Sequence, residues 1–136
     1  MKYISVKNIA KFEVRVGDIN YGGHMGNDKS LLIFHDARIR FLESLGYSEM
    51  FIGDNTGIIM SEAHVYFKKE VLLHDILSVD VSVSELSASS FTLSYHVFRQ
   101  QDGAEVIHGS TKIIAYDYER KRVTRIPEVF LEKIMI

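Results

Sequence analysis

Residues 14–45 contain the polar side chains that are best placed for chemistry. Asp18, Asn20, His24 and Asn27 lie in a glycine-rich stretch, G-D-I-N-Y-G-G-H-M-G-N-D, which runs directly into a long apolar helical pattern. A strand end, a tight turn and a helix N-terminus together hold polar side chains beside backbone N–H groups that attract developing negative charge. The arrangement indicates a site rather than a linker.

Three side chains of this stretch are candidates for proton transfer or its support. An imidazole titrates near neutral pH, so His24 is a candidate base; the alternative is a turn residue that donates to a backbone carbonyl. Asp18 shares the side of Asn20 if the backbone stays extended, which makes it a second candidate base. The alternative role of Asp18 is structural, as a turn-forming side chain that accepts hydrogen bonds from nearby backbone amides. Asn20 can hydrogen-bond a carbonyl or a water but cannot take up a proton.

The same stretch resembles the hotdog-fold acyl thioesterases of the 4-hydroxybenzoyl-CoA thioesterase type. The pattern of that family is Asp-x-Asp, a turn with Gly-His or Gly-Gly, an Asn-rich helix start, and an acidic-Ala-Arg triplet within the helix. The matching residues here are Asp18, Gly23, His24, Asn27, Asp36, Ala37 and Arg38. The second Asp, which is the catalytic carboxylate in those relatives, is Asn20 in this chain.

The resemblance implies hydrolysis of an acyl thioester, carried by coenzyme A (CoA) or by an acyl-carrier protein, to a free acid and a thiol. A backbone N–H of Gly23 or His24 would bind the oxyanion as water attacks. Asn20 would orient the carbonyl or the water, and Asp18 or His24 would act as the base. The residues expected to contact the substrate are Tyr21, Asn27, Ser61 and Ala63.

Two other functions remain open at this point. The replacement at Asn20 also suits a protein that binds acyl thioesters without hydrolysing them efficiently. A hotdog hydratase or dehydratase is a third alternative, because it too needs an acid/base pair.

The composition is that of an ordinary globular chain. Its 136 residues suffice for a single domain, 1–136, with a core of its own; 46% are hydrophobic and 25% are charged. The net charge of -2 provides no general electrostatic reason to expect a nucleic-acid partner. The lack of cysteine excludes disulfides and thiolate metal sites, and it fits a reducing cytoplasm.

Neither a cofactor nor a metal is expected. The six histidines are scattered without metal-ligand spacing, and the chain has neither a Gly-x-Ser-x-Gly elbow nor a phosphate-binding loop. The N-terminus lacks the apolar run of a signal peptide, and no segment has the length of a membrane span. We therefore expect a cytoplasmic protein without a membrane partner.

Hydrophobic periodicity predicts the elements that position the glycine-rich stretch. Alternation predicts a first strand over residues 11–16 and later strands over 58–69, 76–86, 90–100 and 104–118. The long helix is expected to follow a cap at Asn27 or Asp28 and to end at Gly46. A short helix is predicted over 127–134, and the short connections predict antiparallel strand pairs.

The predicted long helix is apolar on nearly all sides, so other elements must surround it. One antiparallel sheet wrapped around one central helix satisfies this order of elements and defines an α+β class with the hotdog fold. The family resemblance implies the same fold. Because such a sheet leaves open edges and a second face, we expect a homodimer or a homotetramer.

Alternation along the strand from residue 58 places Ser61 and Ala63 on one face with Phe67, and Met60 on the other. If the first face meets the helix, the small side chains of Ser61 and Ala63 leave space for an acyl tail, or they simply allow close packing.

Basic residues form two groups that could contact CoA phosphates. These are Lys68 with Lys69, and the residues 120–122. Charged strand ends also serve solubility alone, so the alternative is a purely solvated role.

Overall fold

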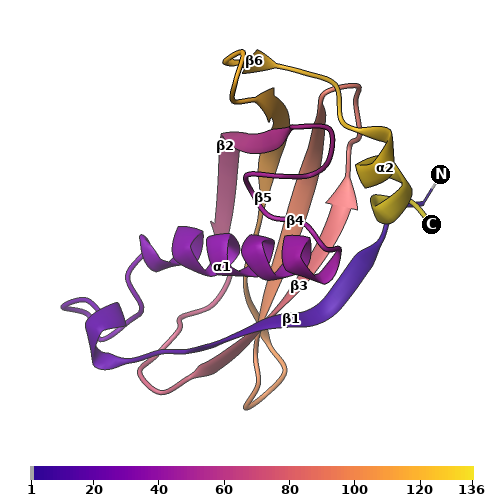
Figure 1. Ribbon diagram of the computed structural model, residues 1–136. Helices are drawn as coiled ribbons and strands as arrows, with labels where there is room; N and C mark the ends of the chain where they lie inside the picture. Colours follow the sequence, from indigo (N-terminus) through magenta and orange to yellow (C-terminus); the bar gives the residue numbers. More distant parts are fainter. Residues whose placement is uncertain (1) are drawn as a thin grey trace.

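The computed structural model describes residues 2–136, in which one antiparallel sheet packs against a long helix (Figure 1). The strands are β1 (Ser5–Glu13), β2 (Gly57–Phe67), β3 (Ile76–Ser84), β4 (Ser90–Arg99), β5 (Glu105–Asp117) and β6 (Arg122–Val123). The helices are a short 3-10 turn η1 (Val16–Asp18), the long α1 (Lys29–Ser44) and the terminal α2 (Glu128–Ile134). The strand order is β1-β3-β4-β5-β2, with β6 paired to the end of β5. This α+β arrangement confirms the predicted fold class.

The first strand lies earlier than alternation predicts. It spans Ser5–Glu13 instead of 11–16, and Val16 belongs to η1 with 72% of its surface exposed. The register with β3 shifts between Val6 and Ala10, where Asn8 has a positive φ of 59°. This irregularity interrupts the period of two in the first half of the strand, so the sequence pattern conceals it.

Both predicted ends of α1 are close to those in the structure. Asp28 occupies the position before the first helical residue, although its side chain makes no capping hydrogen bond. Gly46 follows the helix with φ of +87°, and the N–H of Tyr47 donates to the carbonyl of Leu42 at 2.9 Å. A glycine tolerates this left-handed conformation and allows the last carbonyls to be satisfied.

One face of α1 is buried against the sheet. Its buried residues are Ser30, Ile33, Phe34, Ala37, Arg38, Phe41 and Leu42. The ring of Phe34 stacks on Tyr95 of β4, with centroids 4.4 Å apart and an angle of 6° between the rings. A β-carbon at Gly109 of β5 would lie 2.6 Å from the Phe34 ring, so only glycine permits this close approach. The helix position is therefore set by aromatic packing over a glycine.

The opposite side of α1 is left uncovered by the rest of residues 2–136. Leu31 and Leu32 are exposed although the helical pattern is apolar there. They lie with Met60 around a shallow cavity of about 220 Å³ at the β2 side of the helix. Because β2 is an edge strand, an apolar helix side and an unpaired strand edge are left open together.

The acidic-Ala-Arg triplet joins α1 to the sheet and to the following loop. Arg38 is buried and donates from Nε to Glu49 Oε2 at 2.9 Å and from Nη1 to the hydroxyl of Tyr95 at 3.3 Å. His35 contacts the other oxygen of Glu49 at 2.8 Å. Asp36, by contrast, pairs with Arg40 on the helix surface at 3.0 Å. Of the two charged triplet residues, only Arg38 bonds outside the helix.

The Glu49 carboxylate makes stability depend on pH. Burial by itself would raise the pKa of Glu49, but the hydrogen bonds from His35 and Arg38 outweigh it and hold the pKa below the usual 4.5. A depressed carboxyl pKa stabilises the fold above the unfolded value, and this contribution is lost as the pH falls through the folded value.

We predict that Glu49→Gln lowers the free energy of unfolding by about 1–3 kcal/mol at neutral pH, because it removes charge-assisted hydrogen bonds. The difference from wild type should shrink as the pH falls through the lowered pKa of Glu49, because the wild-type carboxyl then becomes protonated as well. Urea unfolding at a series of pH values from neutral to acidic measures this. A difference that stays constant across the series would contradict the assignment.

Candidate active site

A tight turn at Asn20–Gly23 forms the base of the candidate site. The N–H of Gly23 donates to the carbonyl of Asn20 at 3.0 Å, and the N–H of Asn20 donates to the carbonyl of His24 at 2.8 Å. The amide oxygen of Asn20 accepts from the N–H of Gly22 at 3.0 Å. Gly23 has φ of +77°, which favours glycine at this position. Asn20 therefore stabilises the turn with its side chain as well as its backbone.

Asp18 is held by local contacts. Its Oδ2 accepts from the N–H of Arg15 at 2.8 Å, and its Oδ1 lies 3.9 Å from Nζ of Lys29. Its backbone carbonyl accepts from the N–H of Gly26 at 2.8 Å. Only 18% of its side chain is exposed. These contacts are the ones expected of a turn-forming side chain.

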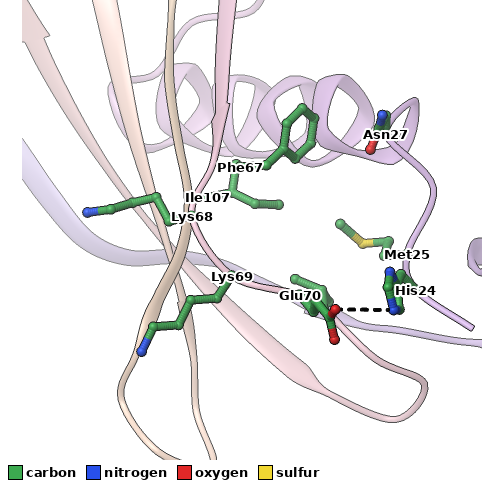
Figure 2. A pocket seen from close by; sticks show the side chains of 9 residues that line it. His24, Met25, Asn27, Phe67, Lys68, Lys69, Glu70 and Ile107 are labelled. Atoms are coloured by element: carbon green, nitrogen blue, oxygen red, sulfur yellow. Dashed lines mark ion pairs between the residues drawn. The ribbon is translucent and has the colours of Figure 1, made fainter.

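The turn is joined by backbone pairing to the segment that follows β2, and a cavity of about 320 Å³ lies between them (Figure 2). The N–H of Met25 donates to the carbonyl of Val71 at 2.8 Å, and His24 and Leu72 form an isolated antiparallel bridge. The cavity lining comprises His24, Met25, Asn27, Phe67, Lys68, Lys69, Glu70, Val71 and Ile107. It combines an apolar part with polar groups from the turn and the helix start, as ligand cavities usually do.

His24 lines this cavity and has two groups that could take part in chemistry, its imidazole and its backbone N–H. Its Nε2 lies 3.5 Å from Oε1 of Glu70. Its backbone N–H makes no hydrogen bond within residues 2–136, whereas the N–H of Gly23 is used by the turn. Of the two backbone donors expected to bind an oxyanion, the one at His24 is thus available.

Of the four residues predicted to contact the substrate, only Asn27 lines this cavity. Asn27 lines the cavity at the start of α1, and Tyr21 is fully exposed on the turn outside the lining. Ser61 and Ala63 are exposed on β2 and are not part of the lining.

The predicted faces of β2 need one correction. The register shifts between Met60 and Glu62, so Met60 opposes Ile113 and Ala63 opposes Thr111, both of which are buried inner-face residues. Met60 therefore shares the helix-facing side with Ala63, and the separation of these two residues by strict alternation is wrong. The extra residue of the bulge is the physical reason.

Sequence reasoning missed the cavity residues Phe67, Glu70, Val71 and Ile107. No local motif marks them, since they approach His24 through pairing between segments more than 40 positions apart in the chain. Lys68 and Lys69 line the cavity, but their amino groups point away from His24 (Figure 2). The second basic group includes Arg122, the first residue of β6, which pairs with the other end of β5 at Tyr116 and Asp117. The two basic groups are consequently not close together.

Residues 2–136 contain no group of three or more His, Cys, Asp or Glu side chains arranged to hold a metal ion. None of the helices among them is long and apolar enough to cross a membrane.

The comparison with known proteins agrees with this geometry. One antiparallel sheet against one long helix, with a cavity beside the helix start, defines a hotdog-fold protein. The chain belongs to the thioesterase-like superfamily, whose family model matches residues 14–134.

Solved structures and one curated protein are similar to the chain. A gentisyl-coenzyme A thioesterase is 26% identical with a TM-score of 0.80, covering 91% of this chain and 97% of the other. A 1,4-dihydroxy-2-naphthoyl-CoA thioesterase from Synechocystis is 15% identical with a TM-score of 0.83, covering 96% and 95%. A protein of Aquifex aeolicus named as a candidate esterase is 32% identical over 68 residues, 49% of this chain and 53% of that protein. This match thus spans about half the length of the curated relative.

We predict that Asp18 acts in the turn rather than in proton transfer. Asp18→Ala should lower the free energy of unfolding by about 1 kcal/mol, because the N–H of Arg15 loses its acceptor. Asp18→Asn retains an acceptor and should keep both stability and turnover within a few-fold of wild type. Urea unfolding and steady-state kinetics test this; a loss of about 100-fold in kcat for Asp18→Asn would restore Asp18 as the base.

Proposed function

We propose that this protein hydrolyses an acyl thioester of coenzyme A. The observation that carries the proposal is the cavity beside the start of α1, where His24 lies next to an apolar lining. The backbone N–H of His24 makes no hydrogen bond within residues 2–136. Membership of the thioesterase-like superfamily supports the reaction class. The name of the gentisyl-coenzyme A thioesterase, which is 26% identical, supports CoA as the carrier.

The apolar part of the cavity fits an acyl group. Met25, Val71 and Ile107 are buried there, and Phe67 closes one side next to α1 (Figure 2). A volume of about 320 Å³ lies at the lower end of the range of ligand cavities. The acyl group would occupy it, and the CoA moiety would extend outside.

The proposed chemistry uses His24 twice. Its backbone N–H donates to the carbonyl oxygen as this oxygen gains charge, and its imidazole takes a proton from the attacking water. The water oxygen forms a bond to the carbonyl carbon, the C–S bond breaks, and the imidazole returns the proton to the thiolate sulfur. The products are a free acid and a thiol.

Asn20 has a supporting role in this proposal. Its amide oxygen is engaged with Gly22, and its carbonyl accepts from Gly23, so the residue shapes the turn that presents His24. Its amide N–H₂ group can also donate to a carbonyl or a water. The replacement of the family carboxylate by Asn20 moves the base function to the imidazole.

We also propose a homodimer that covers the open side of α1. The exposed Leu31 and Leu32 lie beside the edge strand β2. The cavity of about 220 Å³ that they line together with Met60 has room for side chains of the partner subunit. Pairing of β2 with the β2 strand of a second copy would provide hydrogen-bond partners for its unpaired backbone N–H and C=O groups and would bury the two leucines.

We predict that wild type releases free thiol from acyl-CoA substrates, since it has a base and an oxyanion donor without a carboxylate at Asn20. Asn20→Asp, measured beside it, should change kcat by less than about tenfold. A thiol-detecting assay with short, long and aromatic acyl groups makes the measurement. Tight binding without turnover in wild type, together with a gain in Asn20→Asp, would instead establish an acyl-thioester binding protein; hydration of an enoyl thioester without thiol release would establish a hydratase.

We predict that Leu32→Asp converts the dimer to a monomer, because a charge replaces an apolar contact at the interface. Val123→Asp on β6 is the matched control, since the two wild-type residues are 54% and 51% exposed and only Leu32 lies on the open helix side. Sedimentation equilibrium measures the mass of both variants. A wild-type monomer, or a Leu32→Asp dimer, would refute the proposed assembly.

A further inference from the structure

Glu70 stands beside His24 although the two residues are 46 positions apart in the sequence. Its Oε1 lies 3.5 Å from Nε2 of His24, and both residues line the same cavity (Figure 2). Within residues 2–136, the Glu70 carboxylate makes no other ion pair or hydrogen bond. We infer that Glu70 is the positioning residue of His24, so that the two form a His–Glu pair in place of the carboxylate absent at Asn20.

The backbone holds this pair together. The N–H of Met25, directly after His24, donates to the carbonyl of Val71, directly after Glu70, at 2.8 Å. The His24–Leu72 bridge continues the contact by one residue on each side. The two side chains therefore approach each other because their main chains are paired, and not through a chance encounter of long side chains.

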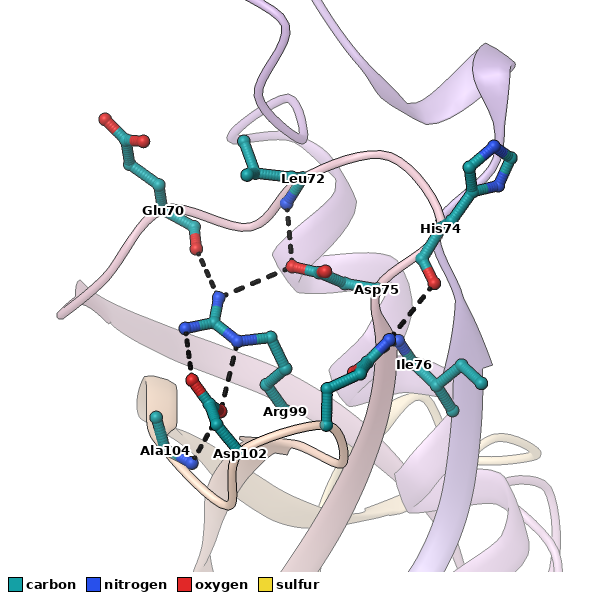
Figure 3. Close-up of polar contacts among 9 residues, drawn as sticks. Glu70, Leu72, His74, Asp75, Ile76, Arg99, Asp102 and Ala104 are labelled. Atoms are coloured by element: carbon teal, nitrogen blue, oxygen red, sulfur yellow. Dashed lines mark hydrogen bonds and ion pairs between the residues drawn. The ribbon is translucent and has the colours of Figure 1, made fainter.

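Arg99 at the end of β4 fixes the peptide of Glu70 (Figure 3). Its Nη1 donates to the backbone carbonyl of Glu70 at 2.9 Å and lies 3.4 Å from Oδ2 of Asp75. Its Nε and Nη2 donate to the two oxygens of Asp102 at 3.1 and 3.0 Å. The same Asp75 oxygen accepts from the N–H of Leu72 at 2.9 Å. Arg99 thus binds the main chain of Glu70 and leaves its carboxylate to His24.

The contact determines which imidazole nitrogen is basic. A carboxylate facing Nε2 favours the tautomer with the proton on Nε2, so Nδ1 keeps the lone pair that accepts a proton. Once Nδ1 has taken a proton from water, the imidazolium charge lies next to the negative Glu70. This is the role that an orienting carboxylate has in a Ser-His-Asp triad.

The pair contributes little to folding, which separates its function from a structural role. The side chain of Glu70 is 67% exposed and that of His24 is 44% exposed. Ion pairs between side chains as exposed as these contribute little to the stability of a fold. Removal of the Glu70 charge should consequently change catalysis and not stability.

The inference rests on the proposed function, and Glu70→Gln tests it. We expect kcat to fall about 10- to 100-fold with KM within about threefold, and Glu70→Asp to recover part of the loss. In combination with His24→Gln, Glu70→Gln should cause little further loss, because the two residues act as a unit. Glu62→Gln is the matched control: Glu62 lies 3.3 Å from His64 in another exposed pair outside the cavity, and its loss should leave kcat unchanged.

A spectroscopic measurement separates this inference from the proposed function. Imidazole ¹⁵N shifts of His24 should report the Nε2–H tautomer in wild type and a loss of that preference in Glu70→Gln. An inactive wild type that keeps this tautomer would overturn the hydrolase proposal and support the pairing. An active wild type with an unchanged kcat in Glu70→Gln, or multiplicative losses in the double variant, would overturn the role of Glu70.

Discussion

The ring of Phe34 lies flat on Tyr95 and directly above Gly109, and this packing fixes α1 against the sheet. Any side chain at Gly109 would push the helix outward, because the missing β-carbon is the space that the ring occupies. The Tyr95 hydroxyl then meets Arg38 on one side and Thr111 on the other, which satisfies polar groups that the packing buries. Helix, sheet and the Glu49 loop are joined through these contacts.

The position of α1 also decides where the site is formed. Its first turn follows the glycine-rich stretch without a linker, so a fixed helix start fixes the turn at Asn20–Gly23. The paired backbones of Met25 and Val71 then bring the end of β2 to the same place. A cavity with an apolar floor and an imidazole at its side results from two chain segments that are each anchored elsewhere.

Position 20 holds an asparagine and not a carboxylate, and the structure places a carboxylate near His24 from another part of the chain. The Asn20 side chain supports the turn, and the only carboxylate beside His24 among the described residues comes from Glu70 on the facing segment. In the proposed mechanism, the turn keeps its backbone geometry while the charged group comes from a different element. The open side of α1 is also incomplete, because its exposed leucines are not covered by any other part of residues 2–136.

Features that depend on near neighbours in the chain can be predicted from the amino-acid sequence. Alternating Leu77, Val79 and Val81 predicted a strand, Gly46 predicted the helix end, and the glycine-rich stretch marked the region of the site. Periodicity and turn chemistry act over a few residues, so they can be read directly. The bulge beside Met60, the early first strand, and the meeting of Glu70 with His24 were decided by the tertiary structure. Each depends on the register of segments distant in the chain, and no local pattern records which residue of one strand opposes which residue of another.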